Sequence, residues 1–220
     1  MHLATMLYNL HTHRPVLTPG VVEIESVYFG QEKKPLSPRL SVGLHPWHLH
    51  GVDWIQAEQW LREQAADPAI VAIGEAGLDK VVATPWDVQM TAFQLCFNVS
   101  EENNKPLILH CVRAFDELLA LKKTWKPAQA WIFHGFEKNA ETARRLLQAG
   151  CYLSFGAALF REKSRAAEAL RQTPANRLFL ETDAADFSIE KVYQRAAELR
   201  GETPEKLAAQ IAENMAALFG

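Results

Sequence analysis

Short apolar runs alternate with amphipathic stretches along most of this chain, most clearly from residue 50 onward. Trp54, Ala57 and Leu61 recur at helical spacing and would form one apolar helix face. Pro68 ends that pattern, and the continuous apolar run at 70–74 is typical of a strand buried on both faces. A helix followed by such a strand is the repeating unit of a parallel sheet.

The same pattern predicts the rest of the chain. Helical spacing favours helices near 88–99, 115–119, 143–147, 166–172 and 189–199, and a last helix that opens at Thr203-Pro204. Strands are expected at 3–10, 21–28, 40–44, 70–74, 106–109, 130–133, 152–155 and 177–180. Such strands, with helices following from the third onward, predict an α/β fold of the (β/α)8 TIM-barrel class.

The first third departs from that regular alternation. Residues 14–20 and 30–39 connect the first three expected strands, are rich in proline, glycine and polar residues, and show no helical pattern. The outer helices between these strands are therefore expected to be missing. Because no linker, repeat or low-complexity tract interrupts the pattern, residues 1–220 are interpreted as a single domain.

Histidine and acidic residues follow many of the expected strands. In a parallel barrel the carboxyl ends of the strands meet at one rim, where catalytic side chains gather. The residues found there are His11, His13, His45, Glu75, His110, His134, Glu181 and Asp183. Neutral imidazoles and carboxylates in this number suit a pair of divalent metal ions.

Each of these residues also has a simpler interpretation. His11 and His13 could be two partly exposed polar residues at a strand end, and Glu75 or Asp183 could be an ion-pair partner or a helix N-cap. Buried acids and imidazoles are costly unless they are paired. Their recurrence at several separate strand ends therefore favours metal binding over the simpler interpretation.

Ordered motifs around these residues carry a resemblance to a known family. They are His11-Thr12-His13, Gly43-Leu44-His45-Pro46, Gly74-Glu75-Ala76-Gly77-Leu78-Asp79, Pro106-Leu107-Ile108-Leu109-His110-Cys111, His134-Gly135-Phe136, Leu153-Ser154-Phe155-Gly156 and Glu181-Thr182-Asp183-Ala184. Over residues 6–219 the chain resembles the TatD family of metal-dependent hydrolases, within the amidohydrolase-type TIM barrels.

This resemblance implies a set of metal ligands. One ion would be held by His11, His13, Glu75 and Asp183, and a second by Glu75, His110 and His134. Three departures from the family pattern leave every ligand in place. The first third is short, the arginine after His110 is one position late at Arg113, and Ala185 replaces the usual proline after the last motif.

A metal pair would activate water for attack on a phosphoryl or carbonyl group. Asp183 is predicted to bind metal and to orient that water or accept its proton. His45 is predicted to contact the scissile group or the leaving oxygen, the alternative being a structural histidine that pins the Pro46-Trp47 turn.

Three further residues are candidates for substrate binding. Arg113 could hold a phosphate through its planar guanidinium, although an ion pair on a helix surface would explain it equally well. Trp47 and Phe136 could stack on a base, or simply pack at the rim.

The net charge and the cysteine content limit the classes of function and the cellular compartments that are expected. With a formal net charge of −3, the chain has no overall basic surface for nucleic acid, so such a role must depend on a local site. The three cysteines form no CxxC pair, and the chain has no long apolar run or export signal, so a reducing cytoplasm is expected.

The leading hypothesis is a DNase-type nuclease that uses two divalent ions (Mg, Mn, Zn or Ni). The alternatives are a hydrolase of a small amide, lactone or phosphoester, since one fold serves many substrates, and an inactive module that binds metal or a partner.

Overall fold

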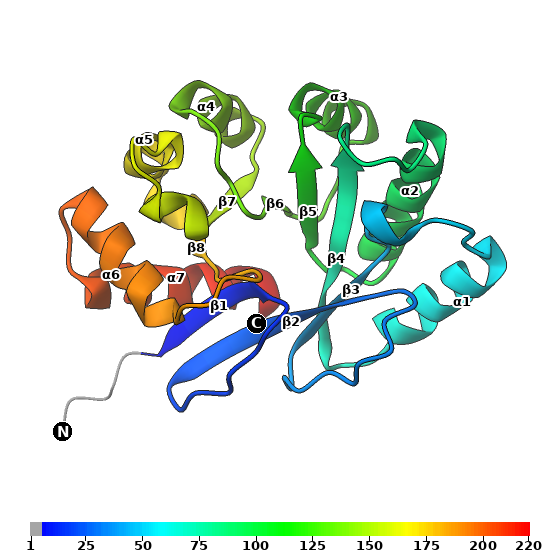
Figure 1. Ribbon diagram of the computed structural model, residues 1–220, viewed down its shortest axis with the longest axis horizontal. Helices are drawn as coiled ribbons and strands as arrows, with labels where there is room; N and C mark the ends of the chain where they lie inside the picture. The colour runs from blue at the N-terminus through cyan, green and yellow to red at the C-terminus, as the bar shows by residue number, and fades with distance from the viewer. Residues whose placement is uncertain (1–5) are drawn as a thin grey trace. The chain divides into compact units, whose positions relative to one another are not determined.

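The computed structural model describes residues 6–220, in which strands and helices alternate from the third strand onward (Figure 1). The strands are β1 (Leu7–Thr12), β2 (Val21–Tyr28), β3 (Leu40–Gly43), β4 (Ile70–Asp79), β5 (Leu107–Val112), β6 (Trp131–Phe133), β7 (Tyr152–Phe155) and β8 (Leu178–Leu180). The α-helices are α1 (Trp54–Ala65), α2 (Trp86–Glu102), α3 (Phe115–Trp125), α4 (Ala140–Gln148), α5 (Arg165–Gln172), α6 (Ile189–Arg200) and α7 (Pro204–Phe219). Short 3-10 helices are η1 (Pro46–His48), η2 (Ala157–Phe160) and η3 (Ala175–Arg177).

The chain divides into two compact units. One, here the terminal unit, comprises the described residues up to Ile24 together with His134–Gly220, and the other, the middle unit, comprises Glu25–Phe133. The interpretation of residues 1–220 as a single domain stays a prediction.

Parallel strands form the sheet of the middle unit. β2 pairs with β3 from Glu25 onward, β3 with β4, β4 with β5, and β5 with β6, all in parallel. Helix α2 lies along β4, and α1 lies beside β3 and β4 (Figure 1). The face of α2 that is buried carries Ala92, Phe93, Cys96 and Val99.

A close approach of two backbones shapes the middle of this sheet. The pairing of β4 with β5 shifts register between Ile73 and Ala76, so Glu75 lies at an irregularity inside β4. Just beyond it, Gly77 has a φ of 153°, and a Cβ there would lie 2.0 Å from the carbonyl oxygen of His110. Glycine is therefore required at 77 for β4 to pack directly against the segment that carries His110.

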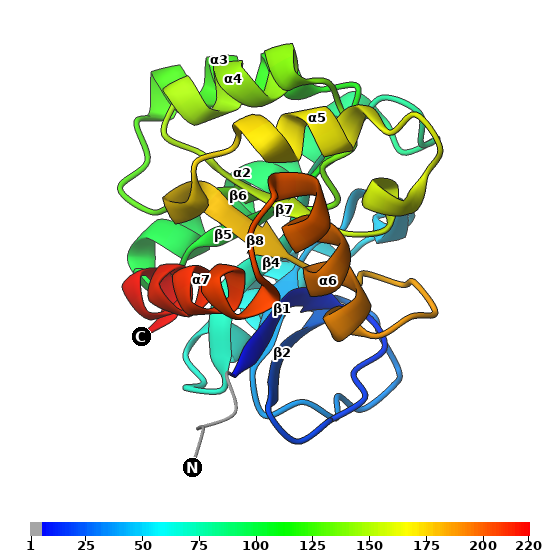
Figure 2. The ribbon, with the colours of Figure 1, turned by 90° about the vertical axis from the view of Figure 1, so that its left-hand side faces the viewer.

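The terminal unit brings the first and last strands together. β7 pairs in parallel with β8, and a parallel bridge joins Thr12, at the end of β1, to Asp183. Helices α6 and α7 pack on β1 and β8 (Figure 2). Thr203 caps α7 through its hydroxyl, which accepts a hydrogen bond from the Lys206 amide, as the Thr203-Pro204 pair predicts.

One buried hydroxyl links β1 to α6. The Tyr193 hydroxyl accepts a hydrogen bond from the Tyr8 amide at 3.1 Å and donates to the Tyr8 carbonyl at 3.0 Å. Replacing Tyr193 with phenylalanine leaves both backbone groups without this partner, so we expect a loss of about 1–3 kcal/mol in the free energy of unfolding. Urea unfolding of Y193F and of Y152F, a change at a half-buried tyrosine, checks this, and equal stability of Y193F and the wild type would contradict it.

Most elements fall where the sequence predicts them. Residues 3–5 of the first expected strand lie outside the described residues, and β1 continues to Thr12. Within residues 6–220, no helix intervenes between β1 and β2 or between β2 and β3, as the sequence predicts. Nor does any helix in this range have the length and apolarity needed to cross a membrane.

Candidate metal centre

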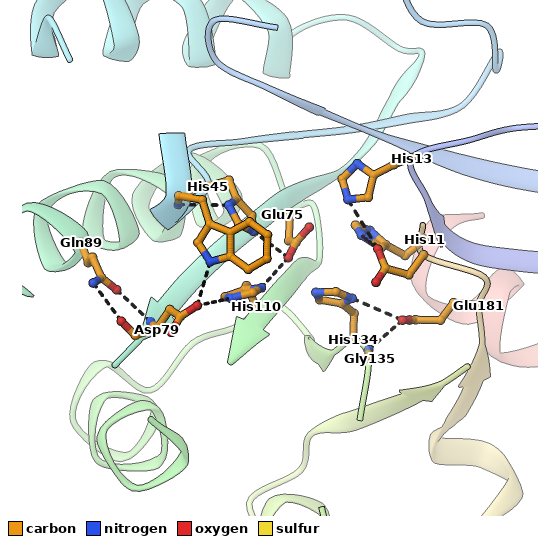
Figure 3. Close-up of polar contacts among 12 residues, drawn as sticks. His11, His13, His45, Glu75, Asp79, Gln89, His110, His134, Gly135 and Glu181 are labelled. Carbon is orange, nitrogen blue, oxygen red and sulfur yellow. Dashed lines mark hydrogen bonds and ion pairs between the residues drawn. The ribbon is translucent and has the colours of Figure 1, made fainter. Parts of the chain in front are cut away.

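The terminal unit gathers two histidines and an aspartate where β1 and β8 end. His11 Nε2 lies 3.8 Å from Asp183 Oδ1, and His13 Nε2 lies 3.6 Å from the same oxygen (Figure 3). The two imidazole rings are almost perpendicular, with centroids 4.9 Å apart. One ligand atom from each of these three residues lies within 4.8 Å of the other two, so the group can hold a metal ion.

Backbone hydrogen bonds hold these three residues together. The Asp183 amide donates to the His11 carbonyl at 3.0 Å, and the His13 amide donates to the Asp183 carbonyl at 3.1 Å. Asp183 has a φ of 54°, a left-handed conformation that aspartate tolerates better than most residues. The side chain of Asp183 thus faces the His-x-His pair because the last strand is bridged to the first.

A second carboxylate in the terminal unit holds His134. Glu181 Oε1 accepts a hydrogen bond from the Gly135 amide at 2.7 Å and lies 3.3 Å from His134 Nδ1 (Figure 3). Burial alone would raise the pKa of the fully buried Glu181, but the neighbouring His134 and His11 imidazoles hold this pKa below its ordinary value. Glu181 is therefore ionised and orients the His134 ring, which lies 4.3 Å from that of His11. We call His11, His13, His134, Glu181 and Asp183 the β1–β8 cluster.

The middle unit has its own group of histidines around Glu75. Glu75 Oε1 lies 2.7 Å from His110 Nδ1 and 3.0 Å from His45 Nε2 (Figure 3). All three residues are buried, and one ligand atom from each lies within 4.8 Å of the others. A buried carboxylate with two imidazoles is a donor set that divalent metals accept.

Asp79 completes this group from the end of β4. Its Oδ2 lies 3.1 Å from His110 Nε2 and accepts the Trp47 indole hydrogen bond at 2.7 Å. Burial alone would raise the pKa of Asp79, but the bonds from Trp47, Val81 and His110 hold it below its ordinary value. An ionised Asp79 orients the His110 ring through Nε2, and the other ring nitrogen, Nδ1, faces Glu75. We call His45, Glu75, Asp79 and His110 the β4–β5 cluster.

His45 has both ring nitrogens engaged in this structure. Nδ1 accepts the Trp47 amide at 3.1 Å and caps η1, so the ring proton is on Nε2 and points at Glu75. Burial lowers the pKa of His45, with partial compensation from Glu75, so the ring is neutral at neutral pH. The turn-pinning role that the sequence left as an alternative is therefore present, and contact with a leaving oxygen stays a prediction.

The chain matches a known protein family over most of its length. The model of the family described as TatD related DNase matches residues 26–220. The chain belongs to this family. It is a metal-dependent hydrolase, as the resemblance implies, and its histidine and carboxylate clusters are able to bind metal.

TatD-family relatives cover most of the chain. An uncharacterized metal-dependent hydrolase, YabD of Bacillus subtilis, is 30% identical over 94% of this chain and 84% of its own length. A 3'-5' ssDNA/RNA exonuclease TatD of Erwinia amylovora is 32% identical over 82% of this chain and 77% of its own length.

Solved structures show the same fold. The crystal structure of YjjV, a TatD homolog from Escherichia coli, superposes with a TM-score of 0.82 at 21% identity and covers 99% of both chains. A TatD-family hydrolase from Entamoeba histolytica gives a TM-score of 0.77 at 14% identity, with 98% of both chains covered. The predicted (β/α)8 TIM-barrel class is confirmed.

Some predicted site residues lie where the sequence did not place them. The strand expected at 70–74 continues to Asp79, so Glu75 lies inside β4 rather than after it. Phe136 is only 2% exposed and packs against Phe155, so it does not present its ring to a base; the packing alternative holds. Trp47 is 57% exposed. Arg113 is exposed in the short loop before α3, so the helix-surface alternative for it does not apply.

Two carboxylates, one in each cluster of this TatD-family chain, had no assigned role in the sequence. Asp79 and Glu181 are both buried and both face a histidine. Asp79 is four residues after Glu75 and shares its strand face by alternation. A strand predicted to continue past Gly74 would have indicated it. Glu181 was visible after the last strand, but nothing in the sequence pairs it with His134.

The Glu181 contact predicts a measurable effect on metal affinity. In a Glu181→Gln variant, a neutral amide replaces the carboxylate beside His134, so the ring is held less firmly. We expect Mn²⁺ to bind about 10- to 100-fold more weakly, measured by isothermal titration calorimetry. Glu168→Gln, an exposed change on α5, is the matched control. Wild-type affinity in the Glu181 variant would refute this positioning role.

Proposed function

We propose that this chain is a nuclease that hydrolyses phosphodiester bonds at the ends of single-stranded DNA. The observation that carries the proposal is the presence, in a TatD-family chain, of two clusters that each combine imidazoles with carboxylate. The E. amylovora relative, named as a single-stranded DNA/RNA exonuclease, supports the choice of substrate.

The donor sets fit divalent metal ions. His11, His13 and Asp183 would hold one ion, and Glu75 with His110 would hold another, while the bridging role of Glu75 and the participation of His134 stay predictions. Mg, Mn, Zn and Ni all accept ligands of these types. Such ions, when bound, would neutralise charge on the attacked phosphoryl group and activate water.

Protein groups would position the substrate and move the protons. Asp183 is 45% exposed at its side chain, so it can reach both an ion and a water molecule and can accept the proton of that water. The neutral His45 ring can turn its Nε2 proton from Glu75 to a leaving oxygen. Arg113, which is exposed after β5, would pair with a phosphate through its guanidinium.

The competing function is hydrolysis of a small phosphoester, amide or lactone. It is favoured by the net charge of −3 and by the absence of a helix between β1 and β3 in the described chain. These features do not select a bond type, because the same metal chemistry serves many esters and amides.

A substrate panel separates the two functions. Protein stripped of metal and reloaded with Mg²⁺, Mn²⁺, Zn²⁺ or Ni²⁺ is given end-labelled single-stranded DNA, the matching duplex, and small phosphoesters, lactones and amides. We expect the release of mononucleotides, faster from the single strand. Turnover of small substrates alone would replace the proposal with the competing function, and no turnover at all would favour an inactive metal-binding module.

A further inference from the structure

An exposed aromatic surface adjoins the β4–β5 cluster. Trp47 is 57% exposed, Val81 61% and Trp86 38%, although large apolar side chains are normally covered. The Lys80 ammonium lies 5.9 Å from the centre of the Trp86 ring and also pairs with Glu117. We call Trp47, Lys80, Val81 and Trp86 the aromatic platform.

Buried and half-buried hydrogen bonds hold the loop that carries this platform. Asp79 Oδ1 accepts the Val81 amide at 2.7 Å, and the Thr84 hydroxyl donates to the Pro46 carbonyl at 2.6 Å. Gln89, which is 2% exposed, donates to the carbonyl of Asp79 (Figure 3). It also donates to the carbonyl of Thr84. The loop between β4 and α2 is thus fixed to the turn that presents Trp47, so a ligand that binds there would not have to order it.

One carboxylate connects the platform to the candidate metal ligands. Asp79 Oδ2 accepts the Trp47 indole hydrogen at 2.7 Å and lies 3.1 Å from His110 Nε2. A flat ligand stacked on Trp47 therefore lies next to the side chain that orients His110. The platform is continuous with the β4–β5 cluster rather than a separate surface.

We propose that the aromatic platform binds single-stranded nucleic acid, with bases stacked on Trp47 and Trp86 and a phosphate beside Lys80. The proposal rests on the proposed function, because the bound strand is the substrate of the hydrolase. Stacking suits a chain with a net charge of −3, since each base stacked on an aromatic ring adds affinity without a basic surface. Unpaired bases expose both faces for stacking, whereas a duplex covers them, so the platform favours single strands.

Binding without hydrolysis tests the platform. The full chain is kept in chelator, and its affinity for a short fluorescein-labelled oligothymidylate is measured by fluorescence anisotropy. Stacking on tryptophan is worth about 1–3 kcal/mol per base, so Trp86→Ala and Trp47→Ala should each weaken binding about 5- to 150-fold. Lys80→Ala should reduce the slope of the logarithm of the binding constant against the logarithm of the salt concentration by about one, which corresponds to the loss of one phosphate contact.

Two comparisons distinguish stacking from a general loss of binding. An abasic oligonucleotide of the same length should bind more weakly to the wild type and lose little further affinity in the tryptophan variants. Phe160→Ala, which removes a similarly exposed aromatic ring from the terminal unit, should bind oligothymidylate like the wild type.

Each outcome decides the proposal. Unchanged affinity in both tryptophan variants, an equal loss for the abasic strand, or no binding of oligothymidylate by the wild type would overturn it. Hydrolysis by the metal-loaded wild type tests the proposed function separately. Tryptophan-dependent binding without hydrolysis would support the aromatic platform and contradict the proposed nuclease function. Hydrolysis by a protein whose oligonucleotide binding does not depend on the tryptophans would support the nuclease function and contradict the platform.

Discussion

A Glu75→Gln variant is expected to lose about a thousandfold or more in DNA hydrolysis while remaining folded. Glu75 Oε1 is the shared neighbour of His45 Nε2 and His110 Nδ1 in the buried β4–β5 cluster. A neutral amide of the same size keeps the packing but removes the charge that a divalent ion needs. Bound metal contributes several kcal/mol to a hydrolytic transition state, and each 1.36 kcal/mol is a factor of ten in rate.

The measurement combines activity with metal content. Initial rates on single-stranded DNA and metal content by elemental analysis should fall together in the Glu75 variant. Glu58→Gln removes an exposed carboxylate of α1 that pairs with Arg62, and it should leave both quantities unchanged. A Glu75 variant with wild-type metal content and wild-type rates would contradict the assignment of Glu75 as a metal ligand.

An Asp183→Asn variant is expected to lose about 10²- to 10⁴-fold in kcat, the usual contribution of a positioned general acid or base. Asparagine accepts the left-handed backbone that Asp183 adopts with a φ of 54°, so its bridge to Thr12 should persist. The amide still offers an oxygen to a metal ion, but it cannot accept a proton from water.

Saturating Mn²⁺ separates the two roles of Asp183. If the residue only binds metal, excess Mn²⁺ should restore the rate of the variant. If it also accepts the proton, kcat should stay low at every Mn²⁺ concentration. Asp186→Asn, an exposed change in the same loop, is the matched control. Full rescue by Mn²⁺ would contradict the proton-transfer role while leaving metal binding intact.

The sequence could predict the fold because each helix and strand is indicated by residues close together in the chain. The β-branched residues of β2 and the helical spacing of α1 each specify an element within a few residues. The Thr203-Pro204 pair marks the start of α7 without help from the rest of the chain. The histidines and acids stood out because polar residues that follow apolar strands converge at one end of a parallel sheet.

The sequence could not predict contacts that depend on packing between distant segments. Asp79 meets Trp47 and His110 only because β4 continues through an irregularity at Glu75 to its full length. Phe136 turns inward onto Phe155, although its position after β6 is equally compatible with an exposed ring. Side-chain direction after a strand end is set by neighbours that a single sequence does not identify.

The two clusters share one chemical arrangement. In each, a buried carboxylate faces one nitrogen of a histidine, with Asp79 beside His110 and Glu181 beside His134. Such pairs fix the tautomer and the orientation of the ring before any ligand arrives. The pKa of both carboxylates lies below the ordinary value, so each carboxylate is ionised at neutral pH.

Anomalous diffraction from crystals of this protein grown with Mn²⁺ tests the central claim most directly. We expect one peak about 2.0–2.3 Å from atoms of His11, His13 and Asp183, and another at that distance from Glu75 and His110. Mn²⁺ bound elsewhere in an enzyme that cleaves DNA, with no density at these side chains, would contradict the assignment of the metal centre.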